Sequence, residues 1–472
     1  VMNLYEYALD DDIAAVATAL APAAISVLRT SGQNAFKKCA AIFSRPKKLL
    51  ESKGNELIHG WILEQGKKVD EVVLCAYRSP KSFTGEDSVE IMCHGGVSVT
   101  LAILNLLLRS GFRQARTGEF TFRSFISGKT DLTKAEAVKE IIDAKTAKAA
   151  ENAASRLSGV LAEKLEQAKR CILYAIAELE VKIEYPEDDG SDEASSIHTE
   201  KISDAMSILE SVTKHWNIQK IYSDGAKVVL AGKPNAGKSR LFNAIINEER
   251  AIVSDIAGTT RDWLETDCNF GGLPIKLYDT AGLRFTNEHI EKLGIDKTKH
   301  LSEAADLILY LADGTREPDT DDFEFLAADK YAGIPKILVF TKQDLLVGES
   351  ADVSVSASAE KLLQAKIIDA TVAISAATNF GIDTLVDKCF SLLVQGETQS
   401  ETVTVGTQRQ KTAVERATGF LQHALQSAAA NMPVDAVVLD MEEALHFIGE
   451  LTGELKSDDI LGEIFSNFCV GK

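Results

Sequence analysis

The sequence has no stretch that approaches the roughly 20 consecutive apolar residues that a membrane-spanning helix needs. Its first residues, Val1–Asp12, are polar and acidic and lack the basic and apolar segments of a secretory signal peptide. The seven cysteines are odd in number, and no two are spaced as C-x-x-C. These absences argue against a membrane protein, a disulfide framework and a structural zinc site, and they favour a reducing, cytoplasmic environment.

Acidic residues also outnumber basic residues. The chain has 51 Lys and Arg against 70 Asp and Glu, which gives a net charge of −19. Binding to nucleic acid phosphates depends on counterion release by Lys and Arg, so the chain cannot hold RNA on a general basic surface. Any such contact requires a local patch or a basic partner. The rest of the composition, 45% apolar and 26% charged, is that of a globular protein, and the 472 residues correspond to about three domains.

Changes in residue pattern divide the chain into four segments. Residues 1–130 combine short β-rich runs with an apolar helix, which predicts an α+β domain. Residues 131–221 carry apolar residues at helical spacing, such as Ile172, Ile176, Leu179 and Ile183, and predict a helical bundle. Residues 222–394 alternate apolar runs with helix-length segments, which is typical of a parallel sheet covered by helices on both faces. Residues 395–472 begin as a polar linker and become helical, so the sheet domain is expected to be an insertion within a helical domain.

The expected elements can be named by their residues. The first segment has strands at Ala24–Leu28, Glu71–Tyr77 and Val89–Cys93 and a helix at Val97–Arg109; the third has strands at Lys227–Ala231, Ile275–Tyr278, Leu307–Leu311, Lys336–Phe340 and Thr371–Ile374; the last has a linker over Gln395–Thr407 and helices over Thr412–Phe468.

A phosphate-binding pattern follows the first strand of the third segment. Residues 232–239 read Gly-Lys-Pro-Asn-Ala-Gly-Lys-Ser, which is G-x-x-x-x-G-K-S placed between a strand and a helix. The glycines let backbone N–H groups close around phosphates, Lys238 supplies a positive charge, and the Ser239 hydroxyl can ligate Mg²⁺. The motif in this context predicts a binding site for a nucleoside triphosphate.

Three later motifs indicate guanine. Asp279-Thr280-Ala281-Gly282, Thr341-Lys342-Gln343-Asp344 and Ser375-Ala376 each follow a predicted strand. Asp344 can accept two hydrogen bonds from a guanine edge, which adenine cannot offer. Together these motifs resemble the Ras-like GTPases of the translation-factor-related class. That class usually has Asn at the Thr341 position, so the shorter hydroxyl is expected to weaken the pocket. Leu283 replaces the Gln that orients water in Ras, and another group must do so.

Further motifs make the resemblance more specific. They are Asp255-Ile256-Ala257-Gly258-Thr259-Thr260-Arg261-Asp262, the final Phe465-Ser466-Asn467-Phe468-Cys469-Val470-Gly471-Lys472, and, in the first segment, Ser82-Phe83-Thr84-Gly85-Glu86-Asp87, His94-Gly95-Gly96 and Gly118-Glu119-Phe120. With the inserted G domain, the chain resembles the MnmE (TrmE) family of tRNA-modifying GTPases over nearly its whole length.

The resemblance implies an activity. Members hydrolyse GTP and, with the FAD-dependent protein MnmG, add an aminomethyl or carboxymethylaminomethyl group to C5 of the wobble uridine, U34, of certain tRNAs. The one-carbon unit comes from a tetrahydrofolate derivative, 5-formyl- or 5,10-methylene-tetrahydrofolate. The N-terminal domain binds the folate and forms a homodimer, which assembles with MnmG as a heterotetramer. Hydrolysis is stimulated by K⁺ when the two G domains pair.

The resemblance also implies site residues. Folate contacts fall on Arg29, Glu90, Lys129 and Lys472, and catalytic roles fall on Lys238, Glu291 and Cys469. The nucleotide contacts are Asn235, Ala236, Gly237, Lys238, Ser239, Arg240, Ser254, Thr259, Thr260, Asp279, Thr280, Ala281, Gly282, Thr341, Lys342, Asp344, Ser375 and Ala376; Mg²⁺ falls on Ser239 and Thr260, and K⁺ on Asn235, Ser254, Ile256 and Thr259. Cys469 has a second interpretation, as a buried free thiol at the end of an apolar helix.

Two other classes share such a G domain. One is a ribosome-assembly or RNA-chaperone GTPase, although these usually append a basic RNA-binding module and here the flanking segments are acidic and helical. The other is a regulatory scaffold in which the nucleotide is only a conformational switch. Folate binding separates both from the tRNA-modifying class.

Overall fold

The computed structural model describes residues 10–184, 199–246, 265–279, 305–346, 357–394, 403–455 and 458–471. The chain forms two compact units. One contains the N-terminal residues through 139, then 154–213, then the residues from 407 onward; the other contains 140–153 and 214–406. The second unit is therefore inserted into the first, as the sequence predicts.

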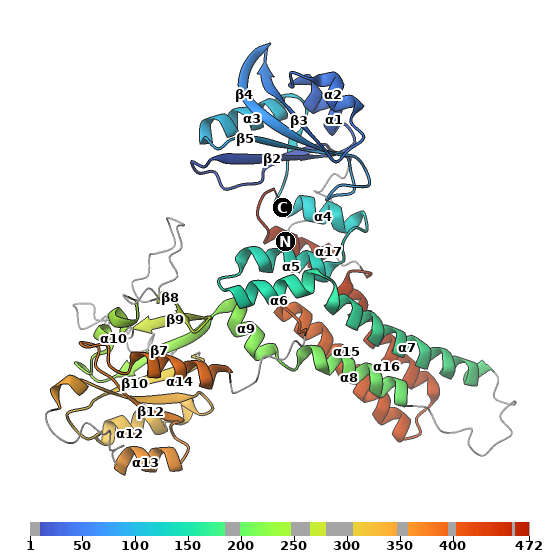
Figure 1. Ribbon diagram of the computed structural model, residues 1–472. Coiled ribbons are helices and arrows are strands. Elements are labelled where there is room, and N and C mark those ends of the chain that lie inside the picture. The colour runs from blue at the N-terminus through green and yellow to red at the C-terminus, as the bar shows by residue number, and fades with distance from the viewer. Residues whose placement is uncertain are drawn as a thin grey trace, which may run out of the picture. The chain divides into compact units, whose positions relative to one another are not determined.

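The N-terminal part of the first unit is built on a mixed sheet of six strands (Figure 1). The strand order is β3-β4-β5-β2-β1-β6, and every neighbouring pair is antiparallel except β1 and β6. The elements are β1 (Ile13–Val16), β2 (Ile25–Ser31), α1 (Ala35–Ala41), α2 (Pro46–Glu51), β3 (Glu56–Glu64), β4 (Lys67–Tyr77), β5 (Ser88–His94), α3 (Val97–Arg109), β6 (Arg113–Gln114) and α4 (Glu119–Ile126).

Successive side chains of a strand point to opposite faces of this sheet, and the apolar ones show which face is covered. Leu28, Leu74 and Ile91 point to one face and pack with Ile103 and Leu107 of α3 and with residues of α1 and α2. The opposite face is covered near β1, where Ile13 and Ala15 contact Phe120 of α4. Farther along that face, Ile25 and Leu57 remain exposed.

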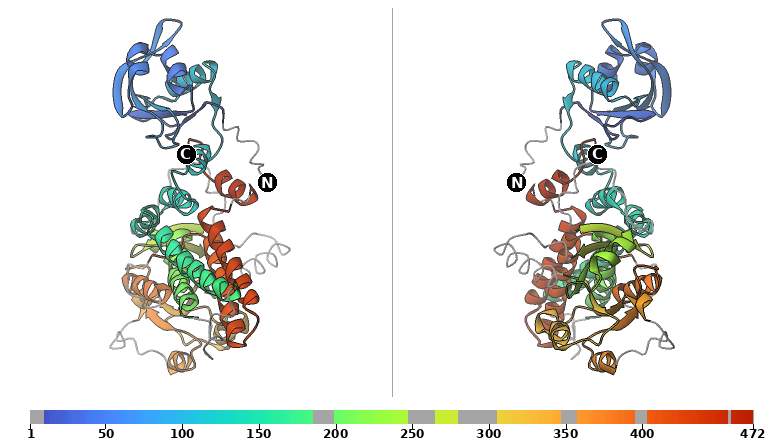
Figure 2. Two further views of the ribbon diagram at one scale, coloured as in Figure 1. Left: turned by 90° about the vertical axis from the view of Figure 1, so that its right-hand side faces the viewer. Right: turned by 90° about the vertical axis from the view of Figure 1, so that its left-hand side faces the viewer.

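Helices make up the rest of the first unit. Figure 2 shows α7 (Val160–Glu184), α8 (Glu200–Thr213), α15 (Gln408–Ala429) and α16 (Val434–Thr452) side by side as a bundle. Ile172, Ile176 and Leu179 are buried, which confirms the helical spacing read from the sequence. Helix α17 (Asp458–Ser466) packs Leu461, Ile464 and Phe465 on α4 and on α5 (Leu132–Asp143), and α6 (Ala147–Leu157) follows α5.

The second unit is a six-stranded sheet with helices on both faces. Its strand order is β12-β11-β10-β7-β9-β8. Val228 and Leu230 of β7 belong to a core with α9, α10 and α14, whereas Val229 and Ala231 belong to a core with α12 and α13. The elements are α9 (Trp216–Asp224), β7 (Ala226–Gly232), α10 (Lys238–Ile245), β8 (Glu265–Phe270), β9 (Leu273–Asp279), β10 (Leu307–Asp313), α12 (Thr320–Ala327), β11 (Lys336–Thr341), α13 (Ala357–Gln364), β12 (Ala370–Ala373) and α14 (Ile382–Val394).

The α+β, helical and Ras-like domains are thus confirmed, with one correction. The sheet of the second unit is not wholly parallel, because β8 pairs antiparallel with β9 at its edge, and the polar composition of β8 concealed it. Of the segment predicted to be a linker, residues Thr404, Val405 and Gly406 are buried. Among the residues that the structure describes, no helix combines the length and apolar character required to cross a membrane.

Candidate functional site

The phosphate-binding loop joins β7 to α10. Gly232 ends β7 with a φ of +133°, and a Cβ there would lie 2.3 Å from the carbonyl oxygen of Leu311, so only glycine fits. Lys238 is the first residue of α10, and its Nζ donates hydrogen bonds of 2.6 and 2.8 Å to the carbonyls of Gly232 and Lys233. The helix N-terminus and the Lys238 ammonium together favour an anion beside this loop.

The loop borders a cavity of about 750 Å³. Most of the predicted nucleotide contacts within the described residues line it, and the residues from the first and third motifs meet there although they are about 100 positions apart in sequence. The lining residues are Gly232, Pro234, Asn235, Gly237, Lys238, Ser239, Arg240, Thr341, Lys342, Asp344, Leu345, Ala376 and Ala377. Pro234 lies within the phosphate-binding motif but was not predicted as a contact, and Leu345 and Ala377 each directly follow a predicted motif.

The predicted guanine-binding residues are held in place by neighbours. The Ser375 hydroxyl, fully buried, donates a 2.6 Å hydrogen bond to Oδ1 of Asp344. Oγ1 of Thr341 lies 2.8 Å from the carbonyl oxygen of Ala236 and 3.1 Å from that of Ala312. A threonine hydroxyl is therefore long enough to join β11 to the phosphate loop, and the expected weakening of the pocket finds no support in this geometry.

Lys342 has a φ of +60°, and its side chain extends from β11 to the end of β10. Its Nζ lies 2.6 Å from Oδ2 of Asp313. Burial alone would raise the pKa of the Asp313 carboxyl, but hydrogen bonds from Lys342 and Thr315 outweigh it and lower the pKa to about 2. The pair ties together the ends of β10 and β11 beside Lys342, which lines the cavity.

Several predicted residues lie outside the described part of the chain. These are Ser254, Ile256, Thr259, Thr260, Thr280, Ala281, Gly282, Glu291 and Lys472, and for Asp279 only the backbone at the end of β9 is described. Within the described ranges, no group of three or more His, Cys, Asp and Glu side chains is arranged to hold a metal ion. Ser239 and Asn235 do line the cavity and have side-chain oxygens suited to Mg²⁺ and K⁺.

A second candidate site lies in the first unit, on the N-terminal sheet. Arg29 of β2 and Glu90 of β5 are opposite each other in the strand register, and their side chains form a 2.7 Å ion pair. The Arg29 guanidinium also faces two aromatic rings, with its central carbon 5.4 Å from the centre of Phe83 and 5.7 Å from that of Phe120. Two of the four predicted folate contacts, Arg29 and Glu90, are therefore neighbours, and two aromatic rings lie against Arg29.

The C-terminal segment reaches the same place. Arg29 Nη1 donates a 3.3 Å hydrogen bond to the carbonyl of Gly471, and Val470 forms a β-bridge with Thr117. Gly471 has a φ of +94°, and a Cβ there would lie 2.5 Å from the carbonyl oxygen of Val16. The glycine of the terminal Cys-x-Gly-Lys is thus required by close packing.

Cys469 does not lie where its structural interpretation placed it. Helix α17 ends at Ser466, and the Cys469 side chain is exposed, so the interpretation as a buried thiol at a helix end is wrong. The Cys469 carbonyl accepts a hydrogen bond from the N–H of Gly118, which holds the backbone here beside the N-terminus of α4. Lys129 lies at the loop that carries Phe83, with its Nζ 2.8 Å from the Pro80 carbonyl.

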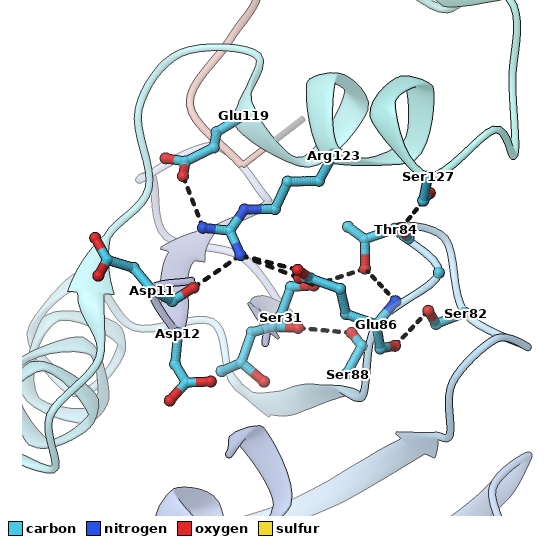
Figure 3. Close-up of polar contacts among 12 residues, drawn as sticks. Asp11, Asp12, Ser31, Ser82, Thr84, Glu86, Ser88, Glu119, Arg123 and Ser127 are labelled. Atoms are coloured by element: carbon cyan, nitrogen blue, oxygen red, sulfur yellow. Dashed lines mark hydrogen bonds and ion pairs between the residues drawn. The ribbon is translucent and has the colours of Figure 1, made fainter. Parts of the chain in front are cut away.

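A buried polar network behind this site was missed at the sequence level. Figure 3 shows the Arg123 guanidinium between the carboxylates of Glu119 and Glu86. Burial would raise the pKa of Glu119, but hydrogen bonds from Arg113 and the Arg116 N–H outweigh it and lower the pKa. Two of the family motifs contain Glu86 and Glu119, so the signal was present, but their partner Arg123 is separated from Glu86 by 37 residues.

Comparison with known proteins decides the family. A profile described as the MnmE helical domain matches residues 132–469, and one described as the GTP-binding protein TrmE N-terminus matches residues 12–129. The tRNA modification GTPase MnmE of Treponema denticola is 49% identical over 481 residues, covering 100% of both chains. The chain belongs to the MnmE family. The family prediction is thereby confirmed, and with it the prediction of a GTPase.

Other relatives agree with this family assignment. The proteins named tRNA modification GTPase MnmE from Treponema pallidum and Borrelia recurrentis are each 39% identical, over 100% and 98% of both chains. Solved structures give partial likenesses. Era in complex with MgGDPNP and nucleotides 1506–1542 of 16S ribosomal RNA is 26% identical over 41% of this chain and 66% of that chain, with a TM-score of 0.29. The assignment of this MnmE-family chain therefore comes from the full-length relatives.

Proposed function

We propose that this chain is a GTPase that modifies tRNA at C5 of the wobble uridine, U34, together with a FAD-dependent partner of the MnmG kind. The group added is aminomethyl or carboxymethylaminomethyl, and 5-formyl- or 5,10-methylene-tetrahydrofolate is the one-carbon carrier. Support for the tRNA substrate comes from the full-length relatives named tRNA modification GTPase MnmE.

The observation that carries the folate part is the meeting of Arg29, Glu90 and the C-terminal Gly471. A guanidinium suits the glutamate tail of a folate, a carboxylate suits the N–H donors of a pterin ring, and the exposed face of Phe83 suits stacking. All three groups come from the first unit, so folate binding should not require GTP. Cys469 is exposed two residues before Gly471 and is proposed as a chemical participant.

GTP hydrolysis is proposed to depend on K⁺, Mg²⁺ and pairing of two G domains. Arginine fingers in related enzymes raise phosphoryl transfer by about 10³–10⁵. A K⁺ ion held by Asn235, Ser254, Ile256 and Thr259 could supply a comparable charge, with Mg²⁺ on Ser239 and Thr260. Glu291 is proposed to orient water. Of these residues, Asn235 and Ser239 lie at the cavity, which supports their part of the assignment.

A homodimer through the N-terminal domains is proposed as well, completed by MnmG as a heterotetramer. Ile25 of β2 and Leu57 of β3 lie on the open face of the sheet, and 57% and 69% of their respective surfaces are exposed. Large apolar side chains on an uncovered sheet face favour association with a second copy.

Mass spectrometry of tRNA nucleosides tests the reaction. A strain lacking the gene should lose the modified wobble uridine, and a plasmid carrying the parent chain should restore it. Lys238→Ala should not restore it, because the phosphate loop loses its cation. Arg109→Ala is the control, since Arg109 lies on α3 of the first unit and its exposed side chain pairs with exposed Glu64. Unchanged wobble uridines in the deletion strain would favour the ribosome-assembly or scaffold class instead.

Calorimetry tests the folate assignment separately. The full chain should bind 5-formyl-tetrahydrofolate without GTP, and Arg29→Ala or removal of Lys472 should weaken that binding, whereas Arg109→Ala should not. If Arg29→Ala and the truncated chain titrate like the parent, the contacts are assigned to the wrong residues. Absence of any heat with the parent chain would remove folate from the function.

A further inference from the structure

The loop between β4 and β5 is held by an unusually complete set of polar contacts. Within Ser79–Asp87, the Ser79 hydroxyl donates to the Gly85 carbonyl at 2.8 Å, and the Ser79 N–H donates to Asp87 at 2.9 Å. Ser127 of the segment after α4 donates to the Thr84 carbonyl at 2.7 Å (Figure 3). Phe83 lies within this loop with 42% of its surface exposed. The loop therefore presents an aromatic ring from a fixed backbone.

The centre of these contacts is Arg123 of α4, which is 2% exposed. One of its nitrogens, Nη1, lies 3.1 and 3.2 Å from the two carboxylate oxygens of Glu86 and 2.8 Å from the Asp11 carbonyl. The other, Nη2, lies 3.0 Å from Glu119. Glu86 also accepts a 2.7 Å hydrogen bond from Ser31 of β2. A single guanidinium thus joins the loop, helix α4 and the residues just before β1.

The two elements that Arg123 joins each place an aromatic ring against Arg29. Phe83 comes from the loop, and Phe120 comes from α4, one residue after Glu119. The Phe120 ring is fully buried, and Phe83 is the ring open to solvent. If the loop moved away from α4, the Arg29 guanidinium would keep one aromatic neighbour and lose the other.

We propose that Arg123 is a positioning residue of the N-terminal site: it holds the Phe83 loop against α4, so that Arg29 and Phe83 face the ligand in a fixed geometry before binding. This inference rests on the proposed folate function. Pre-ordering a binding loop increases affinity because less conformational freedom is lost when the ligand binds. The choice of an ionic group fits this role, since buried ion pairs often add little stability compared with apolar packing and can instead specify one arrangement.

The test compares variants of the full chain by calorimetry with 5-formyl-tetrahydrofolate. Arg123→Lys keeps the positive charge but cannot span Glu86, Glu119 and Asp11 with one planar group. Its dissociation constant should rise about tenfold, an effect of the size expected from losing pre-organisation. Arg109→Lys, on the exposed face of α3, is the matched control and should bind like the parent.

A double-mutant cycle separates positioning from a general structural effect. Phe83→Leu should weaken folate binding, and combining it with Arg123→Lys should weaken binding no further, because Arg123 acts through the Phe83 loop. In the protein without ligand, tryptic cleavage after exposed Lys81 should become faster in Arg123→Lys at a temperature at which both the variant and the parent remain folded. If the factors by which the two single substitutions raise the folate dissociation constant multiply in the double variant, Arg123 acts independently of Phe83 and the proposal is overturned.

Glu86→Gln keeps the experiment decisive if Arg123→Lys does not fold. Its amide retains an oxygen acceptor but loses the negative charge that faces Arg123. Like Arg123→Lys, this variant should bind folate more weakly and be cleaved faster by trypsin after Lys81. Parent-like folate affinity in the folded variants would overturn the positioning role and leave the folate site standing. A parent chain that binds no folate would overturn both.

Discussion

Nη1 of Arg29 donates a 3.3 Å hydrogen bond to the carbonyl oxygen of Gly471, a residue 442 positions later in the chain. This contact brings the C-terminal segment to the second strand of the N-terminal sheet. It places exposed Cys469 in the same region as the Arg29–Glu90 ion pair. The arrangement around Arg29 therefore depends on the packing of the segment that contains Gly471.

Cys469→Ser tests whether the exposed thiol takes part in the reaction. Because the side chain is exposed, the free energy of unfolding should change by less than about 0.5 kcal/mol, and GTP hydrolysis should be retained. Wobble uridine modification in a strain carrying only this variant should fall strongly. Cys171→Ser, on α7, is the control and should modify tRNA normally. Full modification with Cys469→Ser would exclude a chemical role for this thiol.

Thr341→Val tests the hydroxyl that joins β11 to the phosphate loop. The substitution keeps the side-chain shape but leaves the Ala236 and Ala312 carbonyls without that donor. Loss of such a buried hydrogen bond costs roughly 1–3 kcal/mol of folding free energy. Because the phosphate loop is then held less firmly to β11, GDP affinity measured by fluorescence titration should fall as well. Thr341→Ser keeps the hydroxyl and should bind nearly as the parent does. Equal affinity for the Val and Ser variants would contradict the prediction.

The Lys342–Asp313 pair predicts an acid-sensitive contribution to stability. The pKa of Asp313 is lowered from 3.8 to about 2 in the folded protein, so its contribution is present above pH 4 and is lost as the pH falls toward 2. Asp313→Asn should therefore lower the melting temperature at pH 6, and the difference from the parent should shrink at pH 3. A difference independent of pH would show that the ionic form of Asp313 contributes nothing.

Glu291→Ala tests the proposed orientation of the attacking water. The residue lies outside the described part of the chain, and its role comes from the family resemblance. GTP affinity should be unchanged while single-turnover hydrolysis falls, because positioning of water stabilises the transition state more than the ground state. Glu288→Ala, three residues earlier, serves as the control. Parent-like single-turnover rates for Glu291→Ala would remove it from the mechanism.

The potassium proposal predicts a difference between two salts. GTP turnover should be much faster in KCl than in NaCl at equal ionic strength, and Asn235→Ala should abolish the difference. Asn235 has a φ of +62°, a backbone conformation that Asn adopts readily, so Asn235→Gly is the control for an effect of the turn alone. If Asn235→Gly retains the response to K⁺, the Asn235 side chain is not a ligand. Equal parental rates in both salts would exclude the potassium mechanism and leave the GTPase intact.

Local sequence was sufficient to predict the phosphate loop and the strands that surround it. Gly232, Lys238 and Ser239 act through contiguous backbone and one helix terminus, so their spacing already contains the geometry. The apolar runs of β7, β10 and β11 are buried on both faces and stand out from their surroundings for that reason. The polar edge strand β8 gives no such signal, and it was missed.

The family resemblance named Arg29, Glu90 and the C-terminal motif, but the sequence alone could not show that they meet. That juxtaposition depends on the β2–β5 register and on packing α17 against α4 and α5. Arg123 likewise lies on α4 with no local sign of its role, because its partners Glu86 and Asp11 belong to other elements. Residue spacing determined the nucleotide loop, since the residues that interact there lie close together in the sequence. Only the tertiary structure decided the N-terminal site, because contacts between distant segments depend on the packing of the whole unit.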